Sequence, residues 1–180
     1  MRIAISGTHS VGKSTLIDEF LHVHPDYIHE PEPYTTLVED FGEEFSAEPC
    51  VDDFLRQLEF SINLLAKHKG DENIIYERCP LDFLAYIEAL ESREALKPGR
   101  VQDTHEWLDP ISTAIKHLDL IVYLPIENNS DAEYPKLREA VDRRLNAILL
   151  DDEFGILTTP VVEATGSTAQ RLRIILQKIS

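Results

Sequence analysis

The sequence is poor in cysteine, in basic residues and in long apolar runs. It has two cysteines in 180 residues, Cys50 and Cys79, too few for the disulfide framework of a small secreted domain. No apolar stretch approaches the roughly 20 residues needed to cross a bilayer. The N-terminal apolar run breaks at Ser6 and Gly7, which is too early for a signal peptide. These absences favour a protein of the reducing cytoplasm.

Positive charge is scarce as well. Seventeen Lys and Arg residues stand against 33 Asp and Glu residues, which gives a formal net charge of −16. Nucleic acids and anionic membranes are bound through a basic surface, so we expect neither as a partner. Any phosphate site must therefore be locally basic within an acidic protein. The length fits a single domain over residues 1–180.

Short apolar runs alternate with amphipathic stretches along the chain. Strands are expected within residues 2–6, 26–33, 73–79, 118–126 and 159–166. Helices are expected over residues 13–24, 35–45, 51–68, 81–92, 104–116, 135–150 and 167–179, with a turn at 96–100. This alternation predicts an α/β fold in three layers, with a mostly parallel five-stranded sheet and helices on both faces. Ligands of such sheets bind at the carboxyl ends of the strands.

The stretch GTHSVGKST, residues 7–15, directly follows the first expected strand and leads into the first helix. Its pattern Gly7-x-x-x-x-Gly12-Lys13-Ser14 is that of a phosphate-binding loop, in which glycines let backbone N–H groups turn toward an anion. Lys13 adds a mobile charge, and the hydroxyl of Ser14 is a ligand for Mg²⁺. The residues expected to bind the nucleotide are Gly7, His9, Ser10, Val11, Gly12, Lys13, Ser14 and Thr15. His9 is expected to act through its backbone.

Acidic residues follow two of the other expected strands. Glu77 and Arg78 stand where the apolar run 73–79 ends, although a surface ion pair would give the same pattern. Glu30 and Glu32 follow the second strand, and the prolines between and after them fix a carboxylate above the sheet. Either glutamate could instead be a solvated loop charge.

Together these features resemble the P-loop kinases of small molecules. The likeness is to the deoxynucleoside kinase and thymidylate kinase branch, including ribosylnicotinamide-kinase-like ATP-binding domains. It implies that Glu30 or Glu32 accepts the proton of an attacking hydroxyl, and we place Glu30 in catalysis and Glu32 with the substrate while leaving that choice open. It also implies that Glu77 orients Mg²⁺ and that Arg78 steadies the transferring phosphate. Cys79 departs from the serine usual in deoxynucleoside kinases.

The helix expected over residues 51–68 carries two faces. An apolar stripe accounts for packing, and a second face brings together Asp53, Gln57, Phe60 and Leu64. The resemblance gives Gln57 the task of hydrogen-bonding a base and Phe60 that of an apolar wall. The alternative is a second packing face against another helix or against the partner in a homodimer. Asp82 is a further substrate candidate, or simply an acid in the first turn of its helix.

The helix expected over residues 135–150 supplies basic residues. Arg138 and Arg144 flank its apolar stripe, whereas Arg143 points away. P-loop kinases deliver such arginines from a lid, which we expect around residues 127–144. Surface ion pairs within the helix are the alternative.

The sequence therefore predicts an ATP- and Mg²⁺-dependent phosphotransferase that acts on a nucleoside or a nucleoside monophosphate. Positioning and charge compensation, rather than covalent chemistry, would carry the rate, with Lys13, Arg78, Arg138 and Arg144 as the cations. The alternative is a nucleotide-dependent regulatory ATPase or GTPase switch that has no small-molecule acceptor. The chain has no guanine-selecting NKxD motif, which lowers the case for a GTPase.

Overall fold

The computed structural model describes residues 1–94, 104–127 and 132–179. The turn expected at 96–100 lies outside them. The described strands form one sheet in the order β2-β3-β1-β4-β5, and every neighbouring pair is parallel. The strands are β1 (Arg2–Ser6), β2 (Ile28–Glu30), β3 (Ile74–Glu77), β4 (Leu120–Tyr123) and β5 (Val161–Glu163). This confirms the predicted α/β class and the predicted five strands.

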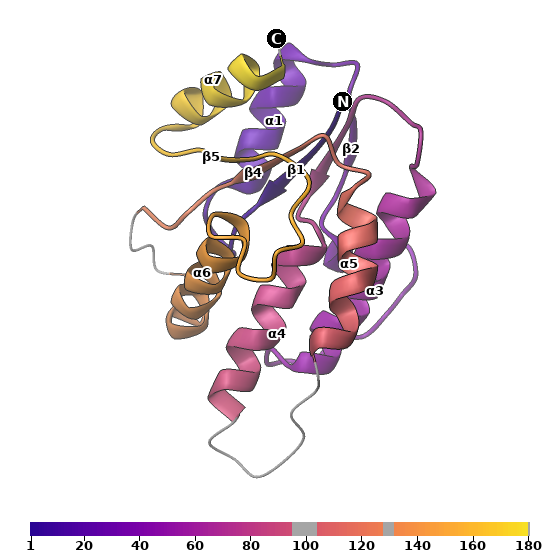
Figure 1. The fold of residues 1–180 in the computed structure, drawn as a ribbon, viewed down its shortest axis with the longest axis vertical. Helices are drawn as coiled ribbons and strands as arrows, with labels where there is room; N and C mark the ends of the chain where they lie inside the picture. The colour runs from indigo at the N-terminus through magenta and orange to yellow at the C-terminus, as the bar shows by residue number, and fades with distance from the viewer. Residues whose placement is uncertain (95–103, 128–131, 180) are drawn as a thin grey trace.

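Helices cover both faces of the sheet, as Figure 1 shows. The α-helices are α1 (Lys13–Val23), α2 (Pro33–Glu39), α3 (Val51–Lys67), α4 (Pro80–Glu94), α5 (Leu108–Ile115), α6 (Pro135–Leu149) and α7 (Thr168–Ile179). Helices α1 and α7 pack together on one face, and α3, α4, α5 and α6 pack on the other. The arrangement is the three-layer architecture that the sequence predicts.

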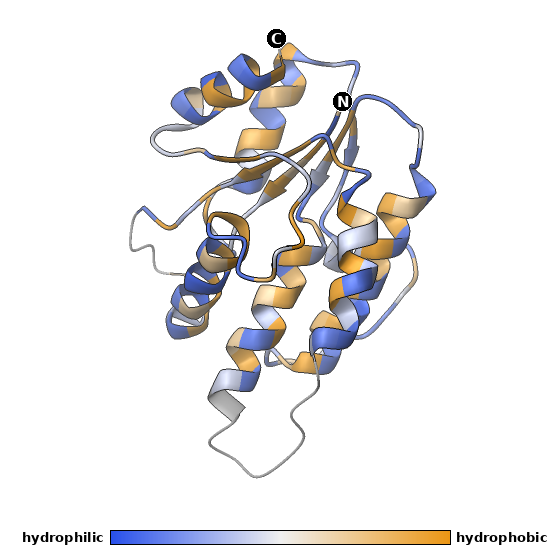
Figure 2. Cartoon of the chain, in the orientation of Figure 1, coloured by the Kyte–Doolittle hydropathy of each residue, from blue (hydrophilic) through white to orange (hydrophobic). Residues whose placement is uncertain are grey.

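The alternation of side chains along β1 divides the core into these two layers. Ile3 and Ile5 pack in the cluster with α1 and α7, whereas Ala4 packs in the cluster with α3 to α6. Strands β1, β3 and β4 are buried because helices cover both faces of the sheet and the strands β2 and β5 occupy its edges. In Figure 2 much of the sheet is coloured hydrophobic, while the helices alternate hydrophobic and hydrophilic residues.

Two of the expected helices differ from those observed. The helix expected over residues 35–45 is α2, which begins at Pro33 and ends at Glu39. Its early start follows from the fixed φ of proline, which suits the first turn of a helix. The helix expected over 104–116 is a 3-10 turn, Thr104–Trp107, followed by the separate helix α5.

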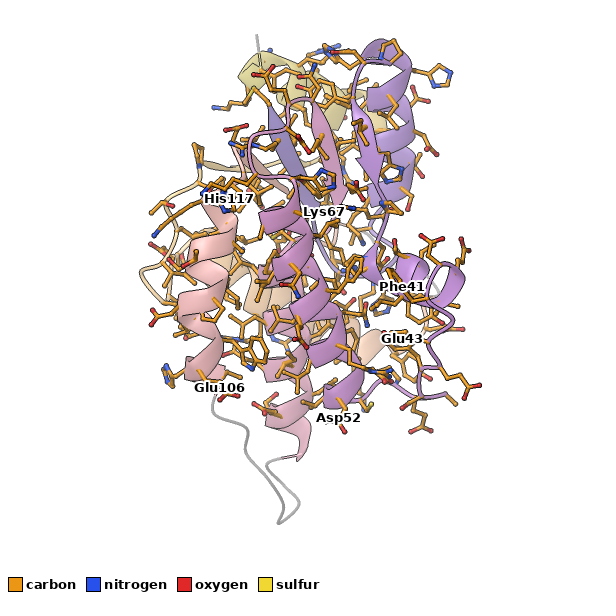
Figure 3. The ribbon with its side chains drawn as sticks, turned by 90° about the vertical axis from the view of Figure 1, so that its right-hand side faces the viewer. Phe41, Glu43, Asp52, Lys67, Glu106 and His117 are labelled. Atoms are coloured by element: carbon orange, nitrogen blue, oxygen red, sulfur yellow. The ribbon has the colours of Figure 1, made fainter. Side chains whose placement is uncertain are left out.

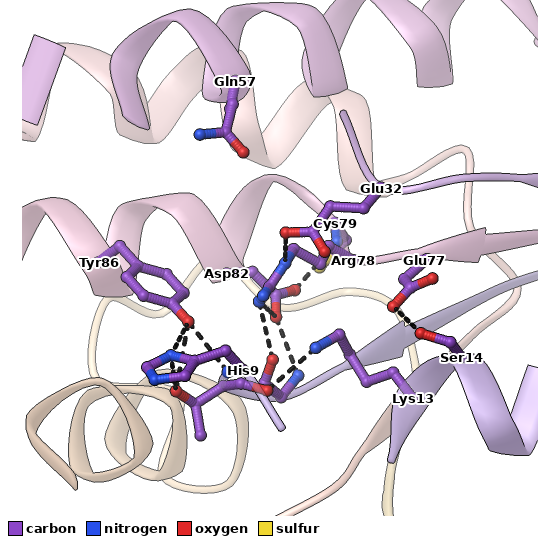
Figure 4. Close-up of polar contacts among 12 residues, drawn as sticks. His9, Lys13, Ser14, Glu32, Gln57, Glu77, Arg78, Cys79, Asp82 and Tyr86 are labelled. Atoms are coloured by element: carbon purple, nitrogen blue, oxygen red, sulfur yellow. Dashed lines mark hydrogen bonds and ion pairs between the residues drawn. The ribbon is translucent and has the colours of Figure 1, made fainter. Parts of the chain in front are cut away.

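Helix α3 matches the expected span and lies beside α5, as Figure 3 shows. Its first turn carries Asp52 and Asp53 and its last turn carries Lys67, which complements the helix dipole at both ends. The first half of α3 carries Asp53 and Gln57, and the side chain of Gln57 points toward the loop after β1 (Figure 4).

Candidate active site at the phosphate loop

The loop between β1 and α1 has a backbone that only glycine permits at two points. A Cβ atom on Gly7, whose φ is 149°, would lie 2.7 Å from the backbone oxygen of Leu124. Gly12 takes a left-handed conformation, with φ of 92°, and is the N-cap of α1. Helix α1 therefore begins at Lys13 with its free N–H groups at the mouth of the loop, which is the arrangement that binds phosphate.

Lys13 is buried, and its Nζ donates a hydrogen bond to the carbonyl oxygen of Thr8 at 3.0 Å. Burial and then the neighbouring Arg78 lower the pKa of Lys13 to about 8. The carboxylates of Glu32, Asp82 and Glu77 oppose this shift in part. A buried cation whose charged form is disfavoured in this way would be stabilised by an anion placed beside it.

Ser14 and Glu77 bring oxygen ligands together. The hydroxyl of Ser14 donates to Oε1 of Glu77 at 2.8 Å, and Glu77 ends β3 directly opposite Ile5 of β1. A hydroxyl and a carboxylate beside a phosphate site are the ligand types that Mg²⁺ prefers. This pair is therefore the candidate metal site.

Arg78 lies at the centre of the site. Its backbone takes φ of 76°, and its guanidinium donates from Nε to Oε1 of Glu32 at 2.6 Å and from Nη1 to the carbonyl oxygen of Gly7 at 2.8 Å (Figure 4). Burial would raise the pKa of Glu32, but the positive charges of Arg78 and Lys13 hold it below its usual value. Glu32 is thus ionised at neutral pH, next to the phosphate loop.

Asp82 is fully buried and binds the backbone of the phosphate loop. Its Oδ1 accepts the N–H of Gly7 and its Oδ2 accepts the N–H of Cys79, each at 2.9 Å. Its side chain therefore joins the phosphate loop to the segment after β3 and faces neither solvent nor the adjoining cavity. Its contacts are those of a framework residue.

Glu30 and Glu32 point to different places although only Pro31 separates them. Oε1 of Glu30 lies 2.8 Å from Nε2 of His68 at the end of α3. Glu32 is the N-cap of α2 and reaches Arg78. The chain leaves β2 at Glu30 and enters α2 at Pro33, and this change of direction separates the two carboxylates. Of the two, the structure brings Glu32 to the phosphate loop.

A cavity of about 430 Å³ opens beside Arg78. Its walls come from the phosphate loop, the residues around α2, the first half of α3, α4 and the start of α6. The lining residues are His9, Ser10, Glu32, Tyr34, Phe45, Ser46, Ala47, Pro49, Asp53, Phe54, Gln57, Arg78, Tyr86, Glu133, Tyr134 and Leu137. Gln57 is buried and points toward Glu32 and Arg78 (Figure 4). Phe60 is not among these residues, and its ring packs against Phe41.

Two aromatic residues that line this cavity, Tyr86 and Phe54, were not predicted as site residues from the sequence. The ring of Tyr86 stacks on Phe54 at 4.4 Å between centroids, and its hydroxyl accepts the backbone N–H of His9 at 3.0 Å. Tyr86 follows Asp82 by one helical turn, so helical spacing could have placed both residues on the face of α4 that meets the loop. Phe54 is likewise one turn before Gln57 on α3.

Arginines from two helices hold the loop. Arg138 of α6 donates from Nε to the carbonyl oxygen of His9 at 3.0 Å. Arg171 of α7, which the sequence reasoning did not single out, donates from Nη1 to the carbonyl oxygen of Val11 at 2.6 Å. Arg144 lies elsewhere and pairs with Glu88 at 2.7 Å and with Glu153 at 2.8 Å. Of the expected lid, residues 128–131 lie outside the described part, and the segment from Pro135 onward belongs to α6.

A family model and several solved structures match the chain. A family model described as an AAA domain matches residues 2–171. Among solved structures, deoxyadenosine kinase from M. mycoides with bound dATP superposes with a TM-score of 0.64 at 16% identity, over 99% of each chain. None of the curated proteins compared with the chain matches it.

Two further structures share the fold. Thymidylate kinase from Candida albicans has a TM-score of 0.66 at 16% identity and covers 99% of this chain and 90% of its own. The NadR protein in complex with NR has a TM-score of 0.63 at 18% identity, and the match covers 99% of this chain but 49% of that one. These matches show that the chain has the fold of deoxyadenosine kinase and thymidylate kinase, as the sequence predicts. In the described part of the chain, none of the helices has the length and apolar character needed to span a bilayer.

Proposed function

The chain belongs to the AAA domain family, and on that premise we propose that it is an ATP- and Mg²⁺-dependent kinase that phosphorylates a hydroxyl group of a nucleoside. One observation carries the proposal. Glu32, held by Arg78, stands between the phosphate loop and a cavity of about 430 Å³ that holds a buried amide, Gln57. This position supports a role for Glu32 as the proton acceptor of a hydroxyl bound beside a phosphate.

The phosphate loop supplies the donor side of the reaction. The N-terminus of α1 and the loop backbone would bind the triphosphate, and Lys13 would exchange its bond to Thr8 for a phosphate oxygen. Ser14 and Glu77 would hold Mg²⁺, which when bound neutralises charge on the transferring phosphate. Arg78 and Arg138 are close enough to the loop to compensate the remaining charge.

The acceptor side favours an alcohol over a phosphate. Three carboxylate residues, Glu32, Asp53 and Glu133, line the cavity. The described residues that line the cavity include one arginine, Arg78, and it is already bound to Glu32. Asp53 is already paired with Arg56, so a second phosphate would face the carboxylates of Glu32 and Glu133 with no unpaired arginine among the described lining residues, whereas a neutral nucleoside needs none. Glu32 is ionised and can take the proton of a hydroxyl as transfer completes.

The rest of the cavity suits a nucleobase. Phe54 and Tyr86 form a stacked aromatic pair on its wall, and flat rings pack well against such surfaces. The side-chain nitrogen of Gln57 donates to the backbone oxygen of Asp53 at 3.2 Å, which leaves its amide oxygen to accept a hydrogen bond from a base. These contacts support a role for Gln57 in base recognition.

The proposal is tested by ATP consumption with Mg²⁺, measured with and without a panel of nucleosides and nucleoside monophosphates. A nucleoside kinase consumes ATP at an appreciable rate only when a nucleoside is added and forms the nucleoside monophosphate in equal amount. Slow hydrolysis at the same rate with every addition would support the regulatory ATPase instead. Faster turnover with monophosphates than with nucleosides would overturn the choice of a hydroxyl acceptor.

A further inference from the structure

The side chain of His9 bridges two walls of the cavity. Its Nε2 lies 2.6 Å from the backbone oxygen of Glu133, in the segment before α6. Its Nδ1 lies 3.0 Å from the hydroxyl of Tyr86 on α4. Both partners line the cavity together with His9 itself. His9 of the phosphate loop therefore contacts both α4 and the segment before α6, which form two walls of the acceptor cavity, the cavity beside Arg78.

These contacts determine the tautomer of the ring. A carbonyl oxygen only accepts, so Nε2 must carry the proton that it donates to Glu133. In a neutral ring Nδ1 is then an acceptor, and the hydroxyl of Tyr86 can donate to it. The same hydroxyl accepts the backbone N–H of His9 at 3.0 Å, and Oγ1 of Thr8, 3.3 Å away, can donate to it as well, so these donor and acceptor roles are compatible.

The surroundings keep the ring neutral. Burial lowers the pKa of His9, and the positive charges of Arg78, Arg138 and Lys13 lower it further. The carbonyl of Glu133 opposes the shift without reversing it. These cations come from the end of β3, from α6 and from α1, so positive charge approaches the ring from three elements.

We infer that His9 is a positioning residue that ties the phosphate loop to both walls of the acceptor cavity, through a donated bond to Glu133 and an accepted bond from Tyr86. Arg138 completes the connection, because its Nε donates to the carbonyl oxygen of His9. The identity of the ligand on each side rests on the proposed function, whereas the bridge itself rests on the contacts of His9. Loss of the side chain should loosen the cavity wall and leave the backbone cradle for ATP in place.

The bridge is tested first by the ¹⁵N spectrum of the histidine rings at pH 7.5, with His9→Gln used to assign the signal. The inference predicts a neutral ring protonated at Nε2. In the Tyr86→Phe variant the Nδ1 signal should move, because Nδ1 loses the hydroxyl as its donor. A neutral ring protonated at Nδ1, or a fully protonated ring, would overturn the inference. This readout needs no substrate.

The second test is steady-state kinetics with deoxyadenosine and thymidine as acceptor probes. His9→Ala should raise the KM for the nucleoside about tenfold, the size expected from losing one or two hydrogen bonds, with the KM for ATP changed less than about twofold. His9→Gln, which keeps an N–H donor for Glu133, should recover part of this loss. The control is His22→Ala, since His22 is exposed on α1 and its Nδ1 lies 3.3 Å from the backbone oxygen of Asp18 in the same helix.

The two failures are distinguishable. If His9→Ala raises both KM values equally, or neither, the positioning role is wrong although the kinase remains. If the wild-type protein phosphorylates neither nucleoside, the proposed function is at fault, and the ¹⁵N spectrum alone decides the inference on His9.

Discussion

Nε of Arg78 donates to Oε1 of Glu32 at 2.6 Å, which joins the end of β3 to the start of α2 directly above the phosphate loop. The same guanidinium also binds the carbonyl oxygen of Gly7. One arginine thus fixes the loop and the acidic residue relative to each other. In the proposed mechanism, this contact would set the distance between a bound phosphate and the carboxylate of Glu32.

The two glutamates of the EPEP segment should differ sharply in their effect on turnover. Glu32→Gln removes the proton acceptor and should lower kcat by about 10²–10⁴-fold, the usual contribution of general base catalysis. Glu30→Gln keeps the shape of a residue that contacts His68 and should change kcat only a few-fold. Kinetics on both purified variants check this, and a larger loss for Glu30→Gln would reverse the assignment.

Lys13→Ala should leave the fold intact and abolish most of the turnover. Burial disfavours the charged form of Lys13, whose Nζ donates to the carbonyl oxygen of Thr8, so its removal should cost the fold little. A well-placed charge in a water-excluded site is worth about 3–4 kcal/mol in the transition state. Circular dichroism and the transfer rate together provide the measurement, and an unchanged rate would exclude a catalytic role for the loop.

The fold could be predicted from the sequence to a large extent, and so could the position of the glycine-rich turn between β1 and α1. The apolar runs of β1, β3 and β4 and the spacing of Gly7, Gly12 and Lys13 are local patterns, and local patterns are visible in a sequence. The limits of α2 were less certain because Pro33 is compatible with either the end of a strand or the first turn of a helix.

The acceptor side depended on contacts between distant segments. Nothing local distinguishes Glu30 from Glu32, because the turn between β2 and α2 decides which carboxylate reaches Arg78. Arg138 and Arg144 likewise flank the same stripe of α6, and only the placement of α4 beside it directs Arg144 to Glu88. Helical spacing shows which arginines of a helix lie beside its apolar stripe, but it does not show which residue of another element each arginine contacts.

Arg138 and Arg144 should therefore have separable effects. Arg138→Ala removes two contacts to the carbonyl oxygens of His9 and Ser10 and should slow phosphate transfer by at least about tenfold. Arg144→Ala breaks partly exposed ion pairs and should lower the free energy of unfolding by about 1 kcal/mol or less, with kcat unchanged. Parallel urea titrations and rate measurements compare the two, and a loss of kcat confined to Arg144→Ala would contradict the account.

Nucleotide binding should take up protons above neutral pH. Because burial lowers the pKa of Lys13 to about 8, part of the population is uncharged at pH 8.5, and an anionic triphosphate favours the charged form. Calorimetry of AMP-PNP binding in buffers of different ionisation enthalpy should thus show proton uptake at pH 8.5 and much less at pH 7. Lys13→Arg is the control, since arginine stays charged and should show no such uptake.

The same pKa shift bears on stability. Between pH 8 and 10.5 the unfolded chain holds a proton on Lys13 that the folded protein has lost. The contribution of this group to the free energy of unfolding therefore rises with pH across that window and is constant below it. In the calorimetry of AMP-PNP binding, equal proton uptake at pH 7 and at pH 8.5 would show that Lys13 is not the group that titrates.

A crystal structure with AMP-PNP, Mg²⁺ and a nucleoside bound together tests the central claim most directly. The account predicts the triphosphate on the loop at residues 7–15 and a nucleoside hydroxyl within about 2.6–3.2 Å of the carboxylate of Glu32, facing the terminal phosphate. A nucleoside whose hydroxyl lies against Glu30, or a cavity beside Arg78 that stays free of nucleoside while the loop holds nucleotide, would contradict it.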